Sequence, residues 1–203
     1  MVATSIKDQV FARLDAIAAG EIPVADVGTL EEESTNLTTN NTTFKKYGKE
    51  WVGARFPEVP PEERQAKLAE YYGFGARRVA LYKHLDAIEA GQVPVAQIGL
   101  REEEARAFCM AENRYMGCGL NWVDLRHPEV PPERRRAKFR EFYGIGPRRV
   151  ALFKHLDAID AGTFPFNEVG GKAEEAARCG LSQKAYMKFG QEWVAEHYPA
   201  TPP

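Results

Sequence analysis

The chain has 203 residues and a net charge of −2, with 27 Lys and Arg against 29 Asp and Glu. This balance gives no global attraction to nucleic acid or anionic lipid, so polyanion binding would require a local basic face. No run of about 18 apolar residues occurs, and the start of the chain lacks the charged and apolar regions of a signal peptide. We therefore expect no membrane span and a cytoplasmic location.

The sequence repeats itself at an interval of 71 residues. Trp51, Trp122 and Trp193 keep that spacing. The string Leu-Asp-Ala-Ile recurs at the same interval, starting at Leu14, Leu85 and Leu156. A glycine and a proline also recur at this interval, namely Gly20, Gly91 and Gly162, and Pro23, Pro94 and Pro165. Because helix formers dominate and no strand alternation is sustained, we predict an all-α fold of three tandem copies of a unit of about 71 residues. The copies are expected to span 1–72, 73–143 and 144–203, the first degenerate and the third truncated.

Each copy is predicted to begin with a long helix. In the second copy, apolar residues at helical spacing run from Val79 to Ala90, and Gly91 is expected to end the helix in the left-handed conformation. The run Arg101–Glu104 follows a Pro-containing connector and reads as a solvated acidic helix start, as does 31–33 in the first copy. Residues 34–43 of the first copy, rich in Thr and Asn, predict a loop or a frayed helix.

A second long helix is predicted from Glu112 to Arg126, carrying Trp122. Aromatic residues and valines share its face with the tryptophan in all three copies, namely Phe44, Tyr115 and Tyr186 with Val52, Val123 and Val194. Core packing is the expected role of this face, and an aromatic ligand cage is the alternative. Connecting helices are predicted over 62–72 and 133–143, the latter with Ala137, Phe139, Phe142 and Tyr143 on its apolar face.

Asp15, Asp86 and Asp157 occupy one repeated position near the end of the first helix of each copy. A carboxylate there opposes the helix dipole, so its retention predicts a compensating partner. We expect it to accept hydrogen bonds from backbone amides at a neighbouring helix start or from the tryptophan indole. A shared ligand-binding acid is the alternative.

The junctions between copies resemble the helix-hairpin-helix motif of DNA-binding proteins. Residues 142–151 (Phe-Tyr-Gly-Ile-Gly-Pro-Arg-Arg-Val-Ala) and 72–79 (Tyr-Gly-Phe-Gly-Ala-Arg-Arg-Val) carry the Gly-apolar-Gly turn. The resemblance implies that backbone amides at the turn contact phosphate, and the two following arginines would add charge-assisted contacts. Local charge agrees, since residues 132–155 hold eight Lys and Arg against two acids. An ordinary interhelix turn with solvated arginines is the alternative.

Residues 174–188 resemble a helix-turn-helix. Ala177 would lie on the first helix, Gly180 at the turn and Leu181 in the core, while Ser182 would cap a recognition helix. A simple packing of two helices is the alternative, because the turn glycine occurs only in this copy.

No sequence pattern indicates catalysis, a metal site or a cofactor. The three cysteines, Cys109, Cys118 and Cys179, are expected to be reduced and to serve as small apolar packers. We predict a nucleic-acid-binding protein, with duplex DNA favoured, and a protein-interaction scaffold without catalysis as the rival. The sequence has no feature that indicates an oligomeric state. The residues expected to contact nucleic acid are Gly73, Gly75, Arg77, Arg78, Arg134, Arg135, Arg136, Lys138, Arg140, Gly144, Gly146, Arg148, Arg149, Gln183, Lys184 and Lys188.

Overall fold

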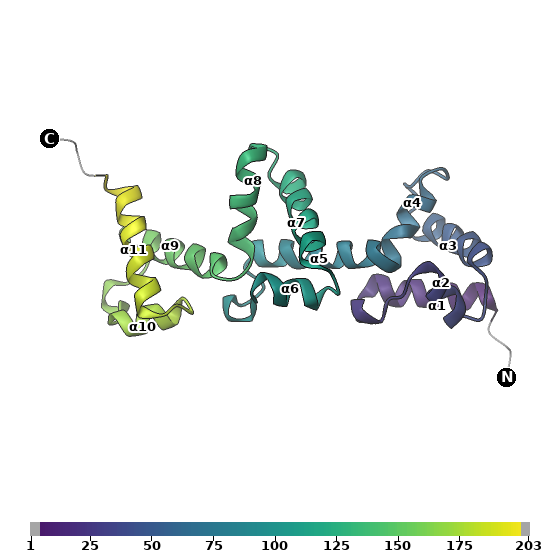
Figure 1. Cartoon of the computed structure of the whole chain (residues 1–203), viewed down its shortest axis with the longest axis horizontal. Helices are drawn as coiled ribbons and strands as arrows, with labels where there is room; N and C mark the ends of the chain where they lie inside the picture. Colours follow the sequence, from purple (N-terminus) through teal and green to yellow (C-terminus); the bar gives the residue numbers. More distant parts are fainter. Residues whose placement is uncertain (1–4, 200–203) are drawn as a thin grey trace. The chain divides into compact units, whose positions relative to one another are not determined.

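The computed structural model describes residues 5–199, and within that range every regular element is helical (Figure 1). The prediction of an all-α fold is confirmed. The helices in chain order are α1 (Ile6–Ala19), α2 (Leu30–Asn36), α3 (Asn41–Arg55), α4 (Arg64–Leu68), α5 (Gly73–Glu89), α6 (Arg101–Ala107), α7 (Glu112–Arg126), α8 (Pro132–Phe139), α9 (Gly146–Asp160), α10 (Lys172–Arg178) and α11 (Gln183–His197). Single 3-10 turns lie at Val24–Asp26, Ala69–Tyr71, Val95–Gln97, Arg140–Phe142 and Phe166–Glu168.

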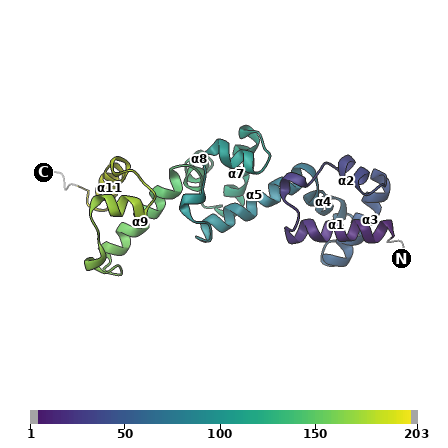
Figure 2. The same cartoon turned by 90° about the horizontal axis from the view of Figure 1, so that it is seen from below.

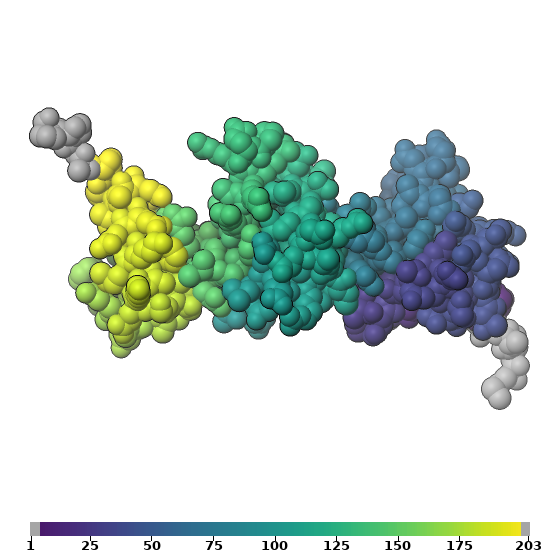
Figure 3. Space-filling model, viewed as in Figure 1, coloured from purple at the N-terminus to yellow at the C-terminus, as the bar shows by residue number. Residues whose placement is uncertain are grey.

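The chain divides into two compact units. One comprises Met1–His84 and Ala105–Cys118, and the other comprises Leu85–Glu104 and Gly119–Pro203. In the first unit, α3 packs along α1 (Figure 2), and buried side chains of both helices belong to one apolar core. The space-filling view shows the outer surface of this unit in purple and blue (Figure 3). The sequence-based division at 72/73 and 143/144 stays a prediction.

Three long helices, α1, α5 and α9, end at glycines in the left-handed conformation. Gly20, Gly91 and Gly162 have φ values of 76°, 70° and 67°. The amide of Gly20 donates to the carbonyl of Ile17 and the next amide donates to Ala16, and the same pair of bonds closes the other two helices. A β-carbon would be strained at this φ, so the prediction of helix-ending glycines is confirmed.

The tryptophan-bearing helices α3, α7 and α11 supply the core, as the helical spacing predicts. Trp51, Trp122 and Trp193 are all buried, and Phe44 on α3 and Tyr115 on α7 are fully buried. Val52 and Val123 are also fully buried, whereas Val194 is 50% exposed. The predicted core face is therefore confirmed on α3 and α7, but on α11 part of it is open.

Several local expectations were wrong. A loop or a frayed helix was expected over 34–43, but residues 34–36 belong to α2 and 41–43 to α3, so only 37–40 lie between helices. Ala137, expected on the apolar face of its helix, is exposed, because α8 turns Phe139 inward instead. Cys109 is exposed at a turn, while the other two free cysteines are buried.

Candidate functional site

The repeated aspartate binds the tryptophan indole. The Nε1–H of Trp51 donates to Oδ1 of Asp15 at 2.9 Å, and the corresponding distances are 2.8 Å for Trp122 and Asp86 and 2.7 Å for Trp193 and Asp157. The indole alternative of the sequence analysis is thus confirmed. The indole N–H is the one polar group of the buried ring, and a carboxylate on the facing helix accepts its hydrogen bond.

An arginine completes the first two of these clusters. Arg55 donates through Nε and Nη2 to both oxygens of Asp15, at 2.9 and 2.7 Å. Arg126 does the same for Asp86, at 3.0 and 2.8 Å. Hydrogen bonds from these guanidinium groups, together with those from the indoles, hold the pKa of Asp15 and of Asp86 below the usual value although partial burial opposes them. Asp15 and Asp86 therefore stay ionised, and their partners lie within the chain, which favours a structural role over ligand binding.

The cluster on α11 differs at the position that corresponds to the two arginines. There His197 lies with Nε2 3.3 Å from Oδ1 of Asp157 and stacks on the Trp193 ring at 4.3 Å between centroids. The sequence analysis missed this set of three basic residues, although Arg55, Arg126 and His197 keep the 71-residue spacing.

Three buried glutamates at the 71-residue spacing form a second set. Glu33, Glu104 and Glu175 have exposures of 0%, 6% and 1%, so the expectation of fully solvated acidic helix starts is wrong at Glu33 and Glu104. Each accepts the amide of a glycine five residues earlier, at 2.7 to 2.8 Å. The glycine lies in the loop before the helix that carries the glutamate. The hydrogen bond therefore folds this loop back over the helix start, and the loop buries the carboxylate.

The side chain that pairs with the buried glutamate differs between Glu33 and Glu175. Arg13 donates to both oxygens of Glu33, at 2.8 and 2.9 Å, whereas His155 lies 2.5 Å from Oε2 of Glu175. Burial raises the pKa of Glu175, but the Gly170 amide and the His155 ring outweigh it and hold that pKa below its usual value. These pairs hold the connector against the helix and offer no open chemistry.

The two Gly-apolar-Gly turns do not present all of their amides. The amide of Gly73 donates to the carbonyl of Gly28 and that of Gly144 to Gly99, both at 2.7 Å, and both turn glycines are buried. The expectation of freely exposed amide donors is wrong at these two positions. A β-carbon on Gly75 or Gly146 would overlap the backbone carbonyl of the preceding helical turn, so close packing accounts for the second glycine.

The arginines after these turns contact their own unit. Arg77 donates to the carbonyl of Cys109 at 3.1 Å, and Arg148 lies beside Gly180. Arg149 is near Glu192 and Glu196, at 3.2 and 3.5 Å. Arg78 is exposed. Two of the four arginines, Arg77 and Arg149, thus have polar partners in their own unit that would compete with phosphate.

The basic segment of α8 and the turn that follows keeps more of its charge available. Arg135 bonds to Val130 and pairs with Asp124, and Lys138 pairs with Glu141 at 2.8 Å. Arg134, Arg136 and Arg140 are exposed, and no ion pair to a described residue accounts for them.

The turn between α10 and α11 has the cap and the turn glycine that were expected there. Ser182 caps α11 by accepting the Ala185 amide at 3.2 Å, and Gly180 has φ 64°. Thr38 and Cys109 adopt the same left-handed conformation at the corresponding positions, so this turn does not depend on glycine. Gln183, Lys184 and Lys188 are exposed on α11, and the last lies 4.0 Å from Glu192.

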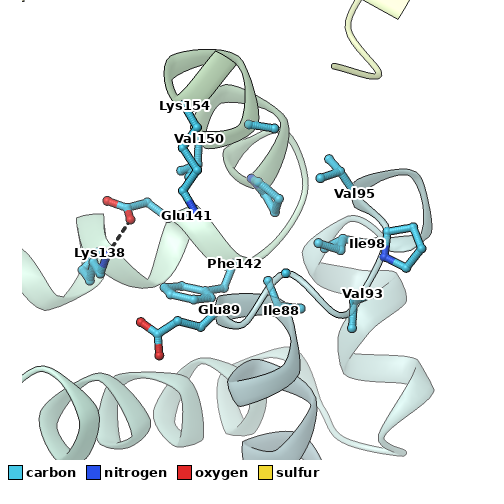
Figure 4. Close-up of a pocket in the computed structure, with 14 residues that line it drawn as sticks. Ile88, Glu89, Val93, Val95, Ile98, Lys138, Glu141, Phe142, Val150 and Lys154 are labelled. Atoms are coloured by element: carbon cyan, nitrogen blue, oxygen red, sulfur yellow. Dashed lines mark hydrogen bonds and ion pairs between the residues drawn. The ribbon is translucent and has the colours of Figure 1, made fainter. Parts of the chain in front are cut away.

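Each unit also has an apolar pocket of about 400 Å³ that the sequence analysis did not foresee. One is lined by Ile17, Ala18, Gly20, Ile22, Pro23, Val24, Val27, Lys67, Glu70, Tyr71, Ala76, Val79, Ala80 and Lys83. The other is lined by Ile88, Glu89, Gly91, Val93, Pro94, Val95, Ile98, Lys138, Glu141, Phe142, Pro147, Val150, Ala151 and Lys154, and Figure 4 shows its apolar side chains around one hollow. All fourteen positions correspond at the 71-residue spacing.

Comparisons with known proteins add no family to this description: no family model, no curated protein and no solved structure matches the chain. Among the residues that the structure describes, no three His, Cys, Asp or Glu side chains are grouped to hold a metal ion. Within the same range, no helix has both the length and the apolarity needed to cross a bilayer.

Proposed function

We propose that the chain is a tandem helical-repeat scaffold that binds protein partners and performs no catalysis. The observation that carries this proposal is the recurrence of one apolar pocket at fourteen corresponding positions. A repeat that preserves a pocket preserves a surface for recognition, and stacked helical units commonly present such surfaces to partner proteins.

The chemistry of the pockets indicates the partner. The walls are aliphatic and aromatic, with Val79 and Tyr71 in the first pocket and Val150 and Phe142 in the second. Lys67 and Lys138 at the rim are neutralised by Glu70 and Glu141. Lys83 and Lys154 are exposed. A segment with a large apolar side chain next to a carboxylate would satisfy both features.

A displayed library of random peptides tests the proposal on the full chain. We expect enrichment of sequences that combine an apolar anchor with an acidic neighbour. Filling both pockets with Ala80→Trp and Ala151→Trp should weaken the selected peptides about tenfold or more. The matched control is Ala137→Trp, which adds the same ring to an exposed helical alanine outside the pockets. Enrichment that survives the pocket substitutions would refute the assignment.

Nucleic-acid binding is the second candidate function, favoured by the exposed Arg134, Arg136 and Arg140. Electrostatic binding of this kind weakens steeply with salt, so a gel shift with random duplex DNA at about 50 and 200 mM salt tests it. Replacing these three arginines with alanine should abolish the shift if the basic segment binds phosphate. Arg148→Ala with Arg149→Ala tests the turn separately.

A further inference from the structure

The tryptophan helices α3, α7 and α11 have corresponding faces that differ in what covers them. On α3 and α7 the face is closed, because Val52 and Val123 are fully buried. On α11 it is open, because Val194 is 50% exposed and Tyr198, which follows the helix, is 55% exposed. The three faces share their glycine, tryptophan and valine, so composition alone does not explain the difference.

Helices of this chain close the first two faces. Leu68 at the end of α4 lies on Gly48, where a β-carbon would come within 2.6 Å of its side chain. Phe139 at the end of α8 lies so close on Gly119 that a β-carbon there would overlap its ring. In both cases the glycine leaves the space that a large apolar side chain of the covering helix fills.

An aromatic residue three positions later in each covering segment reaches the tryptophan. Tyr71 packs edge-on against Trp51 with ring centroids 4.8 Å apart, and Phe142 packs in the same way against Trp122 at 4.7 Å. The lysine before the apolar residue adds a cation–π contact, since Nζ of Lys67 lies 5.1 Å from the centroid of Phe56. The covering segments thus share the pattern Lys-(Leu/Phe)-x-Glu-(Tyr/Phe)-Tyr, at 67–72 and 138–143.

The face on α11 has the same glycine, tryptophan and valine as the two closed faces, but no described residue packs over its glycine. A β-carbon on Gly190 would meet no atom within 4 Å. The hollow at this place has a volume of about 510 Å³, and its walls include Leu156, Tyr186, Trp193 and Val194. Tyr198 stands where Phe56 stands in the first face, so its exposed ring could receive a lysine.

We infer that the α11 face, defined by Tyr186, Gly190, Trp193, Val194 and Tyr198, is a docking site for an amphipathic helix of a partner protein. The partner helix carries the pattern of the covering segments: a leucine or phenylalanine over Gly190 and an aromatic ring three residues later over Trp193. An apolar helix laid into a groove of this kind is a common mode of peptide recognition. This site is separate from the two repeated pockets and does not depend on their assignment.

A peptide of residues 130–144, which contains α8 and its shared pattern, is the probe. Titrated calorimetrically into the full chain, it should bind with one-to-one stoichiometry. Phe139→Ala in the peptide should weaken binding about tenfold or more, because it removes the side chain that fills the space over the glycine. Gly190→Leu in the protein should weaken binding to the same degree by filling that space from the other side.

Gly117→Leu provides the matched control, because Gly117 is also a helical glycine with no atom near a β-carbon and lies on α7 outside the groove. This variant should bind the peptide as the unmodified chain does. Binding that Gly190→Leu leaves unchanged would show that the peptide enters elsewhere, for instance by displacing α8, and would overturn the inference. So would the absence of binding at about 1 mM peptide. The variant with both pockets filled should retain binding, so failure here and failure of the proposed function are distinguishable.

Discussion

Trp122 donates its indole N–H to Asp86 at 2.8 Å, although 36 residues separate the two in sequence. The bond fixes α7 against α5 at the point where both helices approach their ends. The same bond recurs on α3 and α11, so one local device holds the tryptophan helix to its neighbour at each of three places.

Replacing Asp86 should show how much stability is lost when the buried indole N–H of Trp122 has no hydrogen-bond acceptor. Asp86→Ala leaves the buried N–H of Trp122 without its acceptor, and we expect a loss of about 1–3 kcal/mol in the free energy of unfolding. Asp86→Asn keeps an acceptor oxygen and should lose less. Urea denaturation of the two variants measures the difference, and equal losses would show that charge rather than the hydrogen bond is the main contribution.

The arginine-paired aspartates predict a loss of stability in acid. Because Arg55 and Arg126 lower the folded-state pKa of Asp15 and Asp86 below the usual 3.8, their contribution is complete above that value and is lost as the pH falls through the folded-state pKa. Thermal unfolding between about pH 6 and pH 2 should therefore show a steep acid limb. The double variant Asp15→Asn and Asp86→Asn should flatten that limb, and an unchanged slope would assign it to other carboxylates.

The corresponding glycines of the tryptophan helices predict opposite responses to one substitution. Gly119→Ala should destabilise the chain by about 1–3 kcal/mol, because its methyl group would overlap Phe139. Gly190→Ala meets no neighbour and should stabilise by about 0.5–1 kcal/mol through helix propensity. A destabilised Gly190→Ala protein would mean that the α11 face is already covered in solution.

Substitutions of Glu33 and of its partner Arg13 should destabilise the protein to different degrees. Glu33→Ala leaves the Arg13 guanidinium without its carboxylate partner and should lower the free energy of unfolding by about 3–5 kcal/mol. Arg13→His places there the residue that the chain itself carries at positions 84 and 155, and we expect a smaller loss. Chemical denaturation at pH 7 compares the two variants, and the reverse order would contradict the pairing.

Much of this architecture could be predicted because it depends on spacing within one helix. The 3.6-residue pattern placed the tryptophan face on α7, and the isolated position of Gly91 predicted the end of α5. The aspartate was informative because it was retained at a helix end where the dipole disfavours it, and one of its two expected partners was the indole. Such signals are local and act through the backbone.

What could not be predicted depends on residues brought together from distant segments. Glu33 follows two other acids, and its burial results from the return of the Gly28 amide and from Arg13, twenty residues earlier. Arg149 is engaged by acids on α11, more than forty residues away. The repeated pockets likewise arise where the connector after one helix meets the next covering segment, which the sequence pattern does not encode.

Methyl nuclear magnetic resonance on the full chain tests the central claim, the repeated pocket as a binding site, most directly. Titration with a selected apolar–acidic peptide should shift the methyl signals of Ile17 and Val79 in one unit and of Ile88 and Val150 in the other, while Val52 and Val123 stay unchanged. Shifts confined to residues outside both pockets, or no shifts at a saturating concentration, would contradict the proposed function.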